Sequence, residues 1–131
     1  MTYDIQTIPH KDQRYDTVGD YWESEASTGT IVHFRISQLS DPRFEWLVLI
    51  HELTEYFIVK LEGIPLASID EFDKKFEEDR PEGNTDEPGD SIAAPYFMAH
   101  QTATMVERMF AIILGVFWKV YEAEINSLIY N

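Results

Sequence analysis

Residues 41–63 read DPRFEWLVLIHELTEYFIVKLEG, the longest stretch of the chain with helical periodicity. Asp41 is a suitable N-cap, and Pro42 falls at the first helical position, where its missing N–H costs nothing. Gly63 ends the pattern, because glycine readily adopts the left-handed conformation that terminates many helices. The sequence therefore predicts a long helix over residues 41–62 with a sharp stop at its C-terminus.

The residues before this helix predict a small β-structure. Residues 30–37 (TIVHFRIS) alternate between apolar and polar side chains, which is typical of a half-buried strand. Residues 14–23 (RYDTVGDYWE) predict its partner in a hairpin, with a polar connection between the two strands. Residues 1–13 are polar and aperiodic, so the sequence predicts an irregular lead-in there.

Three segments after the long helix also have helical periodicity: residues 66–79, 95–114 and 116–129. Residues 80–95 are acidic, contain three prolines and predict a loop, and loops of this length are often functional or mobile. Together these elements predict a single α+β domain over residues 1–131. Its short N-terminal β-hairpin is expected to pack on three to four helices.

Composition restricts the function. The 131 residues are 44% hydrophobic, include no cysteine, and carry a net charge of −14. Thiol catalysis and cysteine-ligated metal sites are therefore excluded, and direct binding to a nucleic-acid backbone is disfavoured by charge. No apolar stretch is long enough to cross a bilayer and the N-terminus has no signal-peptide pattern, so a cytoplasmic protein without membrane contact is expected.

Two predicted helices each carry a stripe of metal-binding side chains. His51 and Glu55 are separated by four residues on the 41–62 helix, a spacing that lets both side chains reach one ion, and Glu52 lies beside them. On the 95–114 helix, His100 and Glu107 share one face with Thr104.

If the two stripes face each other, His51, Glu55, His100 and Glu107 converge as metal ligands. Two imidazoles with carboxylates suit Zn²⁺, Mn²⁺ or Fe²⁺.

The pentapeptide HELTE (residues 51–55), which follows a strand-like segment, resembles the HExxH helix of zincin-type metallopeptidases. The resemblance implies that His51 binds the metal and that Glu52 is the general base. Glu55 stands where the family has its second histidine, which shifts the metal preference toward harder ions.

A wider resemblance spans residues 30–122. HELTEYFIVKLEGI, SIDEFDKKFE, EPGDSIAAPYFMAHQTATMVER and LGVFWKVYE are together similar to uncharacterised proteins of phage and bacterial genomes. This resemblance implies no established activity.

The stripes also admit two structural interpretations. They form a solvated face, or they form a buried ion-pair network in which Arg108 or Arg80 neutralises Glu52 or Glu55. Asp70 and Asp73 are within reach of a metal from the 66–79 helix, but capping or exposed positions fit them as well. His10 and His33 have no partners in the pattern and are expected at the surface.

Three functions follow from these interpretations. The first is a small metal-dependent hydrolase that acts on an unknown small-molecule or peptide substrate, with Glu52 taking a proton from metal-activated water. The second is a Mg²⁺-dependent helical nucleotide pyrophosphohydrolase, which would use Glu52 and Glu55 and needs a second acidic pair. The third is an acidic, non-catalytic interaction protein such as a phage mimic of DNA, because residues 62–90 alone have a net charge of −8. The sequence leaves the oligomeric state open.

Overall fold

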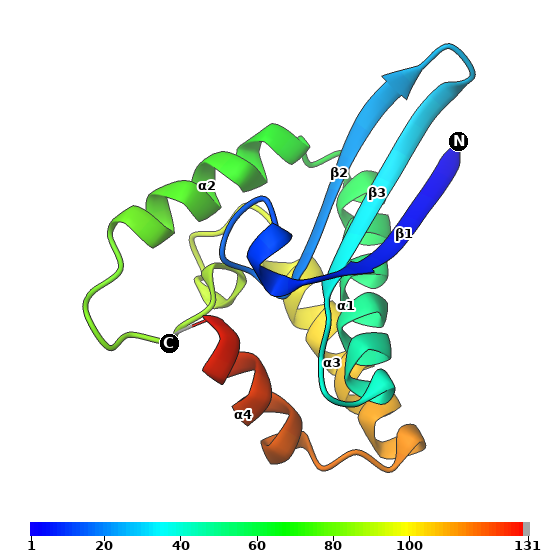
Figure 1. The fold of residues 1–131 in the computed structure, drawn as a ribbon. Helices are drawn as coiled ribbons and strands as arrows, with labels where there is room; N and C mark the ends of the chain where they lie inside the picture. Colours follow the sequence, from blue (N-terminus) through cyan, green and yellow to red (C-terminus); the bar gives the residue numbers. More distant parts are fainter. Residues whose placement is uncertain (130–131) are drawn as a thin grey trace.

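The computed structural model describes residues 1–129 as a three-stranded sheet followed by four α-helices (Figure 1). This arrangement confirms the predicted α+β class. The elements, in chain order, are β1 (Thr2–Ile8), β2 (Gly19–Ala26), β3 (Gly29–Ser37), α1 (Pro42–Glu62), α2 (Leu66–Glu78), α3 (Phe97–Leu114) and α4 (Trp118–Ile129), with short 3₁₀ helices at His10–Asp12 and Pro88–Asp90. The four predicted helices are all present, with ends shifted by up to two residues.

The sheet has the order β1-β3-β2, in which β1 runs parallel and β2 antiparallel to the central strand β3. The irregular lead-in predicted for residues 1–13 is therefore wrong, because most of it forms β1 and a 3₁₀ helix. The hydrophobicity pattern did not reveal β1 because its apolar residues are not buried on one face. Tyr3 and Ile5 are both exposed. Backbone pairing and the contacts of Asp4 with His33 and Arg35 hold it to the sheet.

The first strand of the hairpin is displaced along the chain from its predicted position. Strand β2 begins at Gly19 instead of residue 14 and continues to Ala26, so the connection to β3 is reduced to residues 27–28. The polar residues of this segment are compatible with a strand because they lie at the solvent-exposed end of the hairpin, where burial decreases along β2.

Helix α1 lies between the sheet and α3 and contributes to every cluster of buried apolar residues. Tyr56 packs on Phe34 of the sheet, Val59 packs with Ala99 of α3, and Leu47 belongs to a third cluster with α3 and α4. Its ends are as predicted: Asp41 accepts a hydrogen bond from the Arg43 backbone N–H, and Gly63 has a φ of 72°. No described helix is long and apolar enough to cross a membrane.

The buried side of α1 includes the polar stripe. His51 and Glu55 are 8% and 5% exposed, whereas Trp46 and Phe57 on the opposite side are about half exposed. His100 and Glu107 of α3 are equally buried. The solvated-face interpretation is therefore wrong for these four residues, and the interior of the domain is built around polar groups.

The Asp41 cap provides a test of the helix boundary. Replacing Asp41 by Ala removes the acceptor for the Arg43 N–H and is expected to lower the free energy of unfolding by about 1 kcal/mol. Asp41→Asn keeps an acceptor oxygen while removing the ion pair with Arg43, so its stability should stay near that of the unmodified protein. Urea unfolding followed by circular dichroism measures both. Equal losses in the two variants would contradict the capping role.

Candidate metal centre

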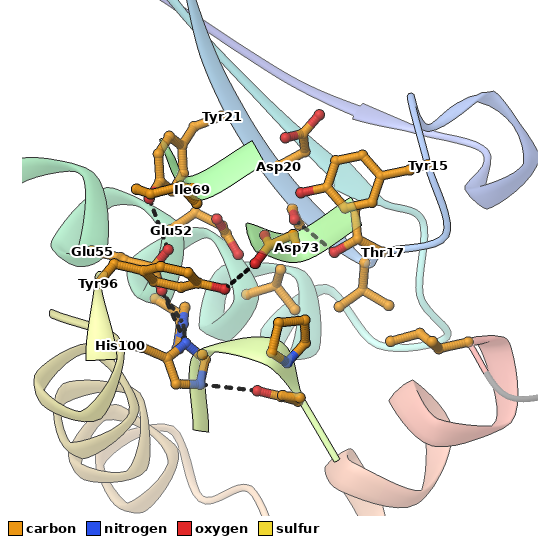
Figure 2. Close-up of a pocket in the computed structure, with 18 of the residues that line it drawn as sticks. Tyr15, Thr17, Asp20, Tyr21, Glu52, Glu55, Ile69, Asp73, Tyr96 and His100 are labelled. Carbon is orange, nitrogen blue, oxygen red and sulfur yellow. Dashed lines mark hydrogen bonds and ion pairs between the residues drawn. The ribbon is translucent and has the colours of Figure 1, made fainter. Parts of the chain in front are cut away.

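A cavity of about 140 Å³ lies between the sheet, α1, α2, α3 and the 3₁₀ turn Pro88–Asp90 (Figure 2). Its lining contains no lysine and no arginine. Nine carboxylate side chains line it: Asp16, Asp20, Glu52, Glu55, Asp70, Asp73, Glu77, Glu87 and Glu107. A cavity wall of this composition attracts cations strongly.

Three side-chain atoms from α1 and α3 converge within this lining. His51 Nε2 lies 3.2 Å from Glu55 Oε2 and 3.3 Å from His100 Nδ1, and the Glu55 oxygen lies 3.0 Å from that same His100 nitrogen. The convergence follows from helix geometry, because His51 and Glu55 are one turn apart on α1 and α3 packs antiparallel beside it. These three residues form a group able to hold a metal ion.

The separations fit shared coordination. Two atoms that each lie about 2.0–2.1 Å from one ion are about 3 Å apart in octahedral geometry and about 3.3 Å apart in tetrahedral geometry. All three measured separations fall in this range.

Two of the three ligand side chains, Glu55 and His51, have their other polar atom hydrogen-bonded. Tyr21 donates to Glu55 Oε1 at 2.8 Å, and His51 Nδ1 lies 2.8 Å from Glu107 Oε1. Tyr121 donates in turn to the second oxygen of Glu107. Such outer contacts set the orientation and tautomer of metal-binding side chains.

Glu107 occupies a different place from the other three predicted ligands. The sequence grouped it with the direct ligands, but it contacts Nδ1 of His51, whereas Nε2 of that ring faces Glu55 and His100. An ion at the three converging atoms is therefore separated from Glu107 by the imidazole ring. The i, i+7 spacing places Glu107 on the same face of α3 as His100. Glu107 nevertheless lies too far along the helix to join the ligand group.

His100 is held from its other side by the turn at residues 87–90. Its Nε2 lies 3.0 Å from Glu87 and 3.3 Å from Asp90. Gly89 allows this approach, because a Cβ at that position would lie 2.4 Å from His100 Cγ. The sequence pattern predicted a loop here and did not assign Glu87 or Asp90 to the site. The run EPGD at residues 87–90, which precedes a histidine-bearing helix, could have indicated them.

The electrostatics of the ligand group reflect mutual compensation. Burial alone would lower the pKa of both imidazoles, but carboxylates raise them: Glu107 and Glu55 raise the pKa of His51 well above its usual value. Asp90, Glu55 and Glu87 raise the pKa of His100 to about 12. Burial would likewise raise the pKa of Glu55. Hydrogen bonds with the two histidines instead lower this pKa to about 2.

Glu52 lines the same cavity without joining the ligand group. Burial raises its pKa well above the usual value, and the charge of Glu55 adds to the shift. Gly19 leaves the space for its side chain, since a Cβ there would lie 2.6 Å from Glu52 Oε1. Asp73 enters from α2, where burial raises its pKa to about 7 and Tyr96 donates to it (Figure 2).

The two arginines expected to neutralise the site contact other groups. Arg108 stacks on the ring of Trp118, with its guanidinium carbon 4.3 Å from the ring centroid. Arg80 hydrogen-bonds to Glu77 and Asn84. The charged partners that hydrogen-bond to Glu55 are the two histidines.

The remaining histidines are less exposed than predicted. His10 and His33 are partly buried, and each contacts an aspartate, Asp16 and Asp4 respectively. Neither lines the cavity.

The chain has no match among protein-family models, curated proteins or solved structures. The resemblance of HELTE to the zincin helix, and that of residues 30–122 to phage and bacterial proteins, therefore remain predictions. The site has to be interpreted from its own geometry.

The contact between Gly89 and His100 supports a double-mutant test. Gly89→Ala inserts a methyl group against the imidazole ring and is expected to lower the free energy of unfolding by about 1–3 kcal/mol. In a His100→Ala background the same change should cost much less, because the ring that it meets is gone. Urea unfolding of the four proteins measures the coupling. Additive effects would show that the turn and the imidazole do not interact.

Proposed function

We propose that the protein is a small metal-dependent hydrolase in which His51, Glu55 and His100 bind one divalent ion. The observation that carries this proposal is the convergence of their three ligand atoms within 3.3 Å of one another, at a buried position. Three protein ligands with a cavity beside them leave coordination positions open, as catalytic sites require and closed structural sites do not.

The ligand types favour particular metals. Two imidazoles and one carboxylate are the donor set of many catalytic zinc sites and of the facial triad of non-haem iron. Magnesium and calcium prefer oxygen ligands alone, so they suit this group less well. Zn²⁺, Mn²⁺ and Fe²⁺ are therefore the candidates, and the absence of cysteine removes the thiolate sites that would select zinc alone.

The chain supplies the remaining parts of a hydrolytic site. A bound divalent ion polarises a carbonyl or phosphoryl oxygen and lowers the pKa of a coordinated water. Glu52 follows the ligand His51 directly and lines the same cavity, which places a carboxylate beside the ligands to accept a proton. Glu87, Pro88 and Gly89 line the cavity from the 80–95 loop, so that loop is positioned to cover a small-molecule or peptide substrate.

A Mg²⁺-dependent pyrophosphohydrolase is the second candidate, and one observation favours it. The sequence offered Glu52-x-x-Glu55 but no second acidic pair on the 95–114 helix. In the structure Asp70 and Asp73 of α2 line the same cavity as Glu52 and Glu55, so the second pair is on another helix. This arrangement supports additional oxygen-ligated ions opposite the histidines.

The acidic interaction protein has weaker support. Mimicry of nucleic-acid phosphates requires carboxylates that point outward at regular spacing. Asp70 and Asp73 of segment 62–90 are instead partly buried in the cavity lining, whereas Glu77 and Glu87 line the cavity but are exposed.

Metal content tests the proposal directly. Protein purified without an affinity tag or chelator is expected to contain one equivalent of Zn, Mn or Fe by elemental analysis. His51→Ala and His100→Ala should each lose the metal, because two ligands rarely retain it. Glu52→Gln should keep both metal and fold while losing hydrolytic turnover, since an amide cannot accept the proton.

His33→Ala is the matched control, because it removes a partly buried imidazole from the sheet and should leave the metal content unchanged. Circular dichroism verifies that each variant is folded. Metal-free protein would refute the proposal, and loss of metal in Glu52→Gln equal to that in His51→Ala would make Glu52 a ligand. More than one equivalent of Mg²⁺ would instead support the pyrophosphohydrolase.

The contact from Glu107 to His51 predicts an indirect effect on affinity. Glu107→Gln preserves the shape of the side chain but removes the charge behind the imidazole, so metal affinity should fall about 10- to 100-fold without abolishing binding. Competition with a metal-binding dye measures this change. Glu62→Gln, at the exposed end of α1, should have the affinity of the unmodified protein. Complete loss of metal in Glu107→Gln would identify Glu107 as a direct ligand.

A further inference from the structure

The side of α3 opposite the site is apolar and exposed. Met98, Met105, Met109 and Ile112 are between 53% and 81% exposed. Together with Thr102 they recur at intervals of four, three, four and three residues. This is the heptad spacing of a seam that packs against another helix.

Helix α1 has a similar stripe. Trp46, Ile50, Leu53 and Phe57 are spaced by four, three and four residues. Trp46 is 54% and Phe57 50% exposed, and Leu61 beyond them is 87% exposed. A helix that is apolar on both its inner and outer sides is normally buried on both.

Both helices turn their site residues toward one cavity, and the two exposed stripes face away from it. Helices α1 and α3 pack against each other in antiparallel directions, since His51 contacts Glu107 while Glu55 contacts His100 (Figure 1). Each stripe lies on its helix opposite the residues that form the site. We define the α1–α3 outer face as the eight residues Trp46, Ile50, Phe57, Met98, Thr102, Met105, Met109 and Ile112, because Leu53 of the α1 stripe is partly buried against the sheet cluster.

This face is large enough to support a stable complex. The six most exposed side chains of this face are together equivalent to between three and four fully exposed ones, or about 750 Å² when a fully exposed large side chain has about 200 Å². A standard protein–protein interface buries about 800 Å² per partner. Exposed apolar patches of this size on soluble proteins usually mark interaction sites.

Local charge does not oppose a second copy at this face. Helix α3 has a single acidic residue, Glu107, which is buried. Between Trp46 and Leu61 the acidic residues of α1 are Glu52 and Glu55, both in the cavity lining. Two chains of net charge −14 can therefore meet through this face without opposing carboxylates, whereas a cationic partner would be attracted to the acidic surfaces instead.

We infer that the α1–α3 outer face binds a second copy of this chain, so that two helix pairs pack in a symmetric four-helix interface. A two-fold arrangement places the same apolar stripes of both copies against each other. The inference concerns a surface opposite the proposed metal site and does not depend on it.

Analytical ultracentrifugation of the complete chain, with and without EDTA, tests this inference. The unmodified protein is expected to sediment at twice the monomer mass of 15.3 kDa and to dissociate on dilution, in both buffers. Ile112→Glu and Met105→Glu each place a carboxylate in the seam and should raise the dissociation constant at least about tenfold, because like charges would face each other across the interface.

Ile92→Glu is the matched control. Ile92 is 87% exposed in the 80–95 loop, close to the 81% of Ile112, and its replacement should leave the dimer intact. Because these positions are exposed, all three variants should retain the circular dichroism spectrum of the unmodified protein. A monomer at every concentration would overturn the inference, as would a dimer that survives both seam variants or that Ile92→Glu weakens equally.

Discussion

The interior of this domain depends on the hydrogen bonds that Glu55 makes to the sheet and to two histidines. One Glu55 oxygen receives the hydroxyl of Tyr21 from the sheet, and the other lies between the imidazoles of His51 and His100. A buried carboxylate is costly unless positive charge and hydrogen-bond donors surround it. The two histidines provide both, and in doing so they fix the sheet, α1 and α3 relative to one another.

This polar centre requires close packing of the backbone around it. Ala99, Ala103 and Ala111 on the inner face of α3 leave room for α1 to approach, and all three are almost fully buried. Gly19 allows the sheet to approach Glu52, and Gly89 allows the 87–90 turn to approach His100. A methyl group at either glycine would collide with that side chain. Small side chains therefore set the distances between ligand-bearing elements, while Tyr21 and Tyr121 reach in from further away to orient the ligands.

Acidic and exposed apolar side chains gather on different sides of the α1–α3 helix pair. Carboxylates gather on the cavity, whereas the residues that define the α1–α3 outer face include none. The same two helices supply both sides, so each helix is apolar on its outer side and presents acidic and histidine side chains to the cavity. A helix of this kind has a weak amphipathic pattern, and its inner face is therefore marked by His51 and Glu55 more clearly than by its leucines.

The sequence alone determined the α+β class, the four helices and the caps of α1, because periodicity, capping residues and glycine stops act locally. Helical spacing also predicted that His51 and Glu55 share one face of a helix and that His100 and Glu107 share one face of another, but only packing decided that the two faces meet. Tertiary structure decided which elements pack together, which residue spacing does not determine. It made β1 a strand through backbone pairing, moved Glu107 behind an imidazole, brought Glu87 and Asp90 to His100 from a loop, and turned the polar side of α1 inward. These outcomes depend on which faces meet in space, and only long-range packing sets that.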